Sequence, residues 1–228
     1  MIVAEQKPFD QIRAMISGYQ RVLVVGCGTC VTVCFAGGEK EVGILGSSLR
    51  MADSIDGKER VIEEATIQRQ CEWEFIDPLK EKVPAYDAIL SLGCGVGVQT
   101  LAEVFPKIPV LPGLNTSFMG LPVEPGVWAE RCAGCGNCLL DRFGGICPIA
   151  RCSKSLMNGP CGGSSGGRCE IDPGVQCGWQ LIYDRLKERG ELWRLEEVVE
   201  AKDWRTSRDG GPRKIVREDL RSLASGEK

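Results

Sequence analysis

The sequence contains no histidine, and this absence excludes several classes of protein. None of its 228 residues is a histidine. Without an imidazole, the chain can have no Ser–His or Cys–His nucleophile, no histidine general base and no histidine ligand to zinc or haem. Hydrolases with a histidine triad, two-histidine zinc enzymes and histidine-ligated haem proteins are therefore excluded.

The sequence also lacks a long apolar run and an excess of positive charge. The best candidate for a membrane span, residues 88–105, is interrupted by Gln99, Thr100 and Glu103, whereas a spanning helix needs about 18 uninterrupted apolar residues. The first residues, MIVAEQKPFD, do not have the basic and then apolar pattern of a signal peptide. The net charge is −3, which disfavours nucleic acid as a partner. We therefore expect a cytoplasmic protein with no membrane insertion.

Cysteine is abundant, with 13 residues in the chain. An intracellular chain with this much cysteine is expected to bind metal rather than to form disulfides, and an odd number does not suit a closed disulfide framework. Five cysteines lie in the first 120 residues and eight lie between Cys132 and Cys177. The segment between the two groups, residues 111–126, is rich in proline and glycine, which is typical of a domain boundary.

The first part of the sequence alternates between strand and helix patterns. Short apolar runs predict strands over 22–25, 61–67, 88–92 and 109–111, and helical spacing predicts helices over 9–16, 42–52, 75–79 and 98–104. This alternation predicts an α/β fold, namely a Rossmann-like parallel sheet domain over residues 1–120. We expect a small cysteine-rich module with C-terminal helices over 121–205, including a helix at 179–186 that ends at Gly190, and then a charged tail over 206–228.

The cysteines of the first part follow the predicted strands. Cys27, Cys71 and Cys94 each come soon after one strand, and Cys30 and Cys34 extend the first loop. Because ligands bind at the carboxyl ends of parallel strands, we expect these thiols to meet and to hold one [4Fe–4S] cluster. Cys30 is preferred over Cys34 as the fourth ligand, and the glycines of GCGTC and GCGVG could aim backbone amides at sulfur.

Two other interpretations of the first group remain open. The segment from Gly26 to Gly28 resembles the start of the dinucleotide fingerprint G-x-G-x-x-G, but Val31 occupies the third glycine position. Alternatively, these cysteines are small buried hydrophobic residues without a ligand.

The second group has a more specific spacing. Its first three members form C-x2-C-x2-C, and a Cys-Pro pair follows after eight residues instead of the three of bacterial ferredoxins. Three close cysteines favour a [4Fe–4S] cluster, because a zinc finger draws two ligands from each of two knuckles. The eight thiolates could hold two clusters, or one cluster and one zinc, and the spacing leaves their grouping open. The candidate ligands are Cys132, Cys135, Cys138, Cys147, Cys152, Cys161, Cys169 and Cys177.

Long motifs of the chain resemble a known family. The run ERCAGCGNCLLDRFGGICPIARCSKSLMNGPCGGSSGGRCEI, followed by CGWQLIYDRLKERGEL, resembles the cysteine-rich C-terminal module of methylenetetrahydrofolate reductases. With CGTCVTVCFAGGEKEVG, RQCEWEF and LSLGCGVGVQTLAE upstream, residues 1–205 resemble the small iron–sulfur subunit of the two-subunit reductase of acetogenic bacteria.

The resemblance implies an electron-transfer role in one-carbon metabolism, in the Wood–Ljungdahl pathway. It implies iron–sulfur clusters on this chain, and the number of thiols predicts two [4Fe–4S] clusters, or at most three, with one zinc as an alternative. It also implies a partner subunit that carries FMN or FAD and reduces 5,10-methylenetetrahydrofolate to 5-methyltetrahydrofolate, and a ferredoxin or another redox subunit as electron donor. No catalytic residue is then expected on this chain. The alternatives are a metal-stabilised scaffold without electron transfer and a cluster subunit of another anaerobic oxidoreductase.

Overall fold

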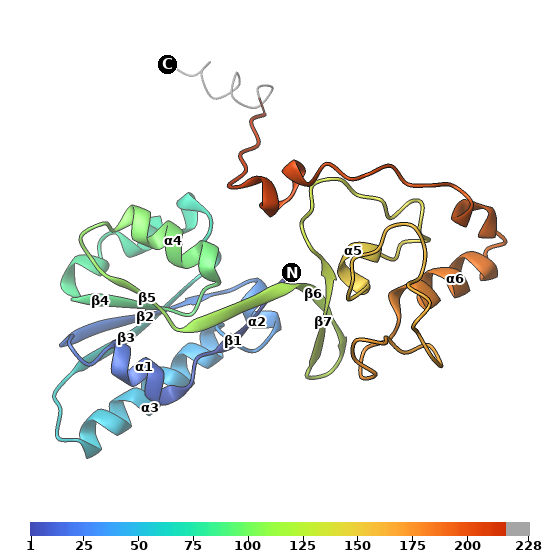
Figure 1. Ribbon diagram of the computed structural model, residues 1–228. Coiled ribbons are helices and arrows are strands. Elements are labelled where there is room, and N and C mark those ends of the chain that lie inside the picture. Colours follow the sequence, from blue (N-terminus) through green and yellow to red (C-terminus); the bar gives the residue numbers. More distant parts are fainter. Residues whose placement is uncertain (218–228) are drawn as a thin grey trace. The chain divides into compact units, whose positions relative to one another are not determined.

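A computed structural model describes residues 1–217, and the chain forms two compact units (Figure 1). The first unit comprises residues Met1–Glu130 and the second begins at Arg131. Residues 218–228, the end of the predicted charged tail, lie outside the described residues. Among the described residues, no helix has both the length and the apolar character needed to cross a lipid bilayer.

The first unit is built on a four-stranded parallel sheet with the strand order β3–β2–β4–β5. In β2 every residue after Arg21 is buried, because layers of helices and turns cover both faces of this central strand. The predicted α/β fold with a parallel sheet is confirmed. The strands are β2 (Arg21–Cys27), β3 (Val61–Ile67), β4 (Ala88–Ser91) and β5 (Val110–Pro112).

Helices on opposite faces of this sheet enclose two apolar cores (Figure 1). Leu45 and Leu49 of α3 pack on the face that carries Val22 and Val24, and α1 adds Ile12 to the same core. Leu101 of α4 packs on the other face. The helices are α1 (Phe9–Met15), α2 (Cys30–Val33), α3 (Glu39–Ile55) and α4 (Gly95–Val104).

The helix predicted at residues 75–79 is wrong. Three short 3₁₀ turns occupy this region, Trp73–Phe75, Asp77–Leu79 and Val83–Ala85. Pro78 and Pro84 each lack a backbone N–H, so a continuous α-helix cannot form through them. The apolar spacing is still meaningful, because Ile76, Leu79 and Val83 are fully or almost fully buried against the sheet.

A second, antiparallel sheet was not predicted from the sequence. Its order is β1–β6–β7, and its strands are β1 (Ile2–Gln6), β6 (Leu114–Glu124) and β7 (Val127–Cys132). The segment rich in proline and glycine therefore contains a long strand and a tight hairpin rather than a simple boundary loop. Pro125 and Gly126 form the hairpin turn, in which Gly126 has a φ of +82° that favours glycine.

The second unit contains little regular structure. Its helices are α5 (Pro148–Arg151) and α6 (Gly178–Glu188), and α6 confirms the helix predicted at 179–186. Trp179, Ile182 and Leu186 of α6 form a small apolar core with Phe143 and Val199. Short 3₁₀ turns follow at Leu192–Leu195, Trp204–Thr206 and Arg208–Gly210. A core of this size leaves the long cysteine-rich loops dependent on other interactions for their shape.

Candidate functional site: three groups of cysteines

In the first unit, three cysteines follow the carboxyl ends of three adjacent parallel strands. Cys27 is the last residue of β2, Cys71 lies four residues after β3, and Cys94 is the N-cap of α4, just after β4. The chain leaves β2 toward one face of the sheet and β4 toward the other, since α3 and α4 cover opposite faces. The carboxyl ends of β2 and β4 therefore form a topological switch point, where open α/β sheets bind their ligands.

The three thiols influence one another electrostatically. Burial raises the pKa of the Cys71 thiol, and the neighbouring Cys94 and Cys27 sulfurs raise it further. Negative charge on neighbouring sulfurs repels a thiolate, so without a positive centre the neutral thiol is favoured at Cys71. Iron or zinc reverses this preference, because a bound metal deprotonates its thiol ligands.

Cys30 and Cys34 lie in different surroundings at the two ends of α2. Cys30 is half-buried at the first residue of the helix. Cys34 is 7% exposed, packs in the core of the first unit, and its Sγ lies 3.6 Å from the Val31 carbonyl oxygen, to which it donates. Burial raises the pKa of the Cys34 thiol. Cys34 therefore has the environment of a structural core residue, which favours Cys30 as the fourth ligand of this group.

A buried glutamine that sequence analysis missed connects the strands beneath these thiols. Gln70 is fully buried, its Nε2 donates to the Val25 carbonyl oxygen at 2.9 Å, and its Oε1 accepts from Ser91 Oγ at 2.5 Å. It thus links β2 to β4 and fixes the residue that precedes Cys71. A Cβ atom on Gly93 would lie 2.3 Å from Gln70 Oε1, and one on Gly97 would lie 2.7 Å from Gln70 Cβ.

These contacts change the interpretation of the second glycine-rich motif, LSLGCGVG. Two of its glycines, Gly93 and Gly97, make room for Gln70, whereas the sequence suggested that such glycines aim amides at sulfur. No spacing rule identifies a lone glutamine as the partner of a glycine-rich loop about 20 residues away. The only local signal is its position next to Cys71.

Replacing Gln70 with leucine is expected to destabilise the first unit and to reduce the metal content of its site. The Ser91 hydroxyl would lose its buried acceptor, and the Val25 carbonyl would keep only the hydrogen bond from the Leu92 amide, so the free energy of unfolding should fall by about 1–3 kcal/mol. Urea unfolding and iron content measure the two effects. Gln99→Leu is the matched control, because Gln99 is exposed on α4. A Gln70→Leu variant as stable as the control would contradict this role.

In the second unit, four cysteines line one cavity of about 210 Å³. Leu139, Leu140 and Ile149 also line it, so the thiols lie in largely apolar surroundings. The Gly134 amide donates to Cys132 Sγ at 3.4 Å, and the Ala150 amide donates to Cys147 Sγ at 3.5 Å. Such N–H···S contacts stabilise thiolate charge. The four cysteines are Cys132, Cys135, Cys138 and Cys147.

The other four cysteines of this unit surround a much smaller cavity, of about 10 Å³. Cys169 Sγ lies 3.3 Å from Ser153 Oγ, and this hydrogen bond lowers the pKa of the Cys169 thiol. Lys154 also lines the cavity, and its hydrogen bond to Glu170 raises the pKa of its ammonium group, which the Cys161 and Cys169 sulfurs raise further. These four cysteines are Cys152, Cys161, Cys169 and Cys177.

The arrangement therefore divides the eight cysteines of the second unit into two groups of four, a division that the spacing left open. Each group has the thiol number of a tetrathiolate site for a cluster or a zinc ion. Among the described residues, no three Cys, Asp or Glu side chains lie close enough together to bind one metal ion in this conformation. The chemistry of the donors fits iron–sulfur clusters and zinc, whose common protein ligands include thiolates.

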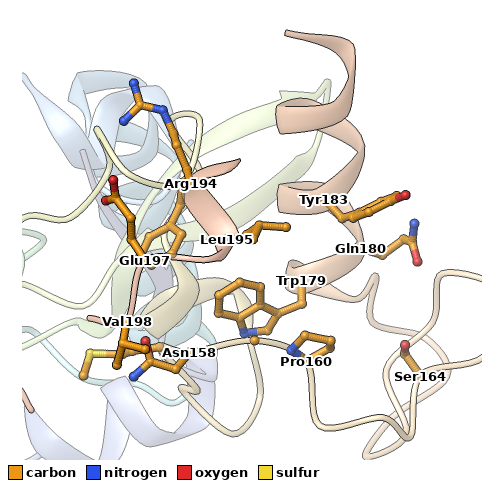
Figure 2. Close-up of a pocket in the computed structure, with 13 residues that line it drawn as sticks. Asn158, Pro160, Ser164, Trp179, Gln180, Tyr183, Arg194, Leu195, Glu197 and Val198 are labelled. Atoms are coloured by element: carbon orange, nitrogen blue, oxygen red, sulfur yellow. The ribbon is translucent and has the colours of Figure 1, made fainter. Parts of the chain in front are cut away.

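A larger apolar cavity lies next to the second group of four. Its volume is about 440 Å³, and Trp179, which also lines the smaller thiol cavity, forms one wall (Figure 2). Figure 2 shows the Trp179 ring near Pro160 and Leu195, with the charged ends of Arg194 and Glu197 directed away from it. Trp179 Nε1 donates to the Leu156 carbonyl oxygen at 3.0 Å. The indole is therefore held in place between the two cavities.

Comparisons with known proteins identify one related family. Residues 111–205 match the family model described as the C terminal of methylene-tetrahydrofolate reductase. The matched segment is less than half of the chain, and it contains all eight cysteines of the second unit. No curated protein and no solved structure matches the chain. The match links the chain to a methylenetetrahydrofolate reductase system, and hence to oxidoreductase and folate chemistry.

Proposed function

We propose that this chain is the iron–sulfur electron-transfer subunit of a methylenetetrahydrofolate reductase. In this role it passes electrons to the flavin of a partner subunit, which reduces 5,10-methylenetetrahydrofolate to 5-methyltetrahydrofolate. The observation that carries the proposal is the division of the eight cysteines in the reductase-related segment into two groups of four, each around its own cavity. The cysteines at the switch point of the first unit add a third group.

The residues of each group have a definite task in this proposal. A [4Fe–4S] cluster supplies a one-electron centre whose potential depends on its hydrogen bonds and its exposure to solvent. Cys132, Cys135, Cys138 and Cys147 would hold one cluster, and Leu140 and Ile149 would contribute to the apolar wall around it. The thiols of the first unit would hold another, using Cys27, Cys71, Cys94 and Cys30. The second group of four would hold a third cluster or a zinc ion.

The proposal assigns the reaction at carbon to the partner. FMN or FAD and the folate would bind to the catalytic subunit, because the cofactor performs the redox chemistry and this chain is equipped with thiols. Electrons would arrive from a ferredoxin or another redox subunit. The protein would then act in the cytoplasm as part of a hetero-oligomer.

Metal analysis of anaerobically purified chain tests the proposal. We expect iron and acid-labile sulfide in similar amounts, because a [4Fe–4S] cluster contains equal numbers of each. Reduction with dithionite should produce an EPR signal from the reduced clusters. Zinc without labile sulfide would contradict electron transfer and would support a metal-stabilised scaffold.

A second measurement distinguishes this function from that of a subunit of another anaerobic oxidoreductase. The dithionite-reduced chain, freed of excess reductant, is mixed with a flavin-containing methylenetetrahydrofolate reductase catalytic subunit. We expect bleaching of the flavin absorbance and reduction of added 5,10-methylenetetrahydrofolate. A stable complex with reduced clusters but an oxidised flavin would contradict the assignment.

A further inference from the structure

The segment 202–217 is basic, although the chain as a whole is acidic. It contains six Lys and Arg residues and two Asp residues, whereas the net charge of the whole chain is −3. Positive charge is therefore concentrated near the end of the described chain. A local field of this kind attracts partners of the opposite charge, even when the overall charge does not.

Hydrogen bonds attach this segment to the loop that carries Cys135. Thr206 Oγ1 donates to the Cys135 carbonyl oxygen at 2.9 Å, and Arg213 Nη1 donates to the Gly134 carbonyl oxygen at 2.6 Å. A Cβ atom on Gly136, whose φ is +80°, would lie 2.2 Å from the Thr206 carbonyl oxygen. Figure 1 shows the segment running beside the loop that follows β7. The cations are thus held next to the first group of four thiols in this unit.

A groove of about 710 Å³ lies between the segment and the loop. Gly136 lines it on the loop side, and Arg205, Arg208, Arg213 and Lys214 line it on the other. Arg205 is paired with Asp203, and Arg213 is hydrogen-bonded to backbone carbonyls. For Arg208 and Lys214 the described residues supply no ion-pair partner. The groove therefore presents positive charge that this part of the chain does not neutralise.

The surroundings of these cations favour a protein as occupant over a small anion. Ile215 is 88% exposed, Val216 is 45% exposed and Trp204 is 40% exposed. Arginine together with exposed tryptophan and aliphatic side chains is typical of protein–protein interfaces. A single exposed ion pair contributes little to affinity, but several cations together accelerate the association of an acidic protein.

We propose that this groove is the docking site of an acidic electron-donor protein. The inference rests on the proposed function and names the place where electrons enter the second unit. In the transfer, the donor would lose one electron, and the cluster that Cys132, Cys135, Cys138 and Cys147 would hold would gain it. No bond forms or breaks, and no proton needs to move.

Stopped-flow reduction of the anaerobically purified full chain tests the docking site. The probe is a reduced acidic ferredoxin, and the variant is Arg208→Glu with Lys214→Glu. We expect the bimolecular rate constant for reduction of this variant at low ionic strength to fall at least about tenfold. The rate constant should also depend less strongly on salt concentration. Arg208→Gln with Lys214→Gln should give an intermediate rate, which shows that the effect follows charge.

A matched control carries the same change of charge in the first unit. Lys80→Glu with Lys107→Glu replaces two exposed lysines there, and its rate should stay within about twofold of the unmodified rate. Reduction by dithionite should be equally complete in all variants, which shows that the clusters are intact. Equal slowing of the control would overturn the docking site, because the effect would then reflect net charge alone.

Two other results would also overturn it. If the Arg208→Glu, Lys214→Glu variant were reduced with the same rate constant as the unmodified chain, ferredoxin would bind at another site. Stronger inhibition by pyrophosphate than by chloride at equal ionic strength would identify the groove as a site for a small phosphate compound. By contrast, an unmodified chain that dithionite cannot reduce would overturn the proposed function, and the docking site with it.

Discussion

Replacing Cys94 with alanine is expected to remove about four iron atoms per chain, the content of one [4Fe–4S] cluster. Cys94 belongs to the group at the carboxyl ends of β2, β3 and β4, where its sulfur acts on the pKa of Cys71. Loss of one of four thiolates from such a site removes the cluster, while the thiols of the second unit remain. Iron and labile-sulfide assays on anaerobically purified protein measure the loss.

Cys34→Ala is the matched control for this experiment, because Cys34 ends the loop that carries Cys27 and Cys30 of the same group. Its side chain is buried in the core and its sulfur donates to the Val31 carbonyl. We expect Cys34→Ala to keep all its iron and to lose only about 1 kcal/mol of folding free energy, as for a small core truncation. Iron loss in Cys34→Ala with full retention in Cys94→Ala would reverse the assignment of ligands.

Replacing Cys135 with serine is expected to lower iron and labile sulfide and to unfold much of the second unit. This unit has only a small apolar core, so a bound metal would supply a large part of its stability. The affected group would be the four thiols around the 210 Å³ cavity. Metal analysis and circular dichroism report the two effects.

Cys169→Ser tests whether the two groups of four are separate sites. It should remove the metal of the smaller cavity, about four irons or one zinc, and leave the metal of the larger cavity bound. Iron retained in full by Cys135→Ser, with zinc lost instead, would identify the larger cavity as a zinc site. Electron entry would then depend on the first unit alone.

Strands β2 and β4 of the parallel sheet could be predicted because they are short and apolar and lead into a Gly-Cys pair, whereas β3 contains Glu63 and Glu64 and has a weaker pattern. The run from Val22 to Val25 contains no polar residue, and the structure buries all four side chains. The antiparallel sheet could not be predicted in the same way. In β6 only Leu114 and Gly120 are buried, so the strand has no clear alternation of apolar and polar residues.

In the candidate site, too, the features set by neighbouring residues could be predicted, and those set by distant parts of the chain could not. Spacing indicates that Cys132, Cys135 and Cys138 act together, because they lie within seven consecutive residues. It cannot indicate that Cys147 joins them while Cys152 belongs to the other group, since that depends on how the intervening chain folds. The role of Gln70 depends on two backbone segments that only tertiary structure brings to it.

The short helix α5 links the two groups of four cysteines directly. Cys147, from the first group, is the N-cap of this four-residue helix. Cys152, from the second group, is its C-cap. Five helical residues span only about 7.5 Å. Metal bound at the first group would fix Cys147 and thereby restrict the conformational freedom of Cys152. The second group would then lose less entropy on being filled, so we expect the two sites of the proposed function to load cooperatively.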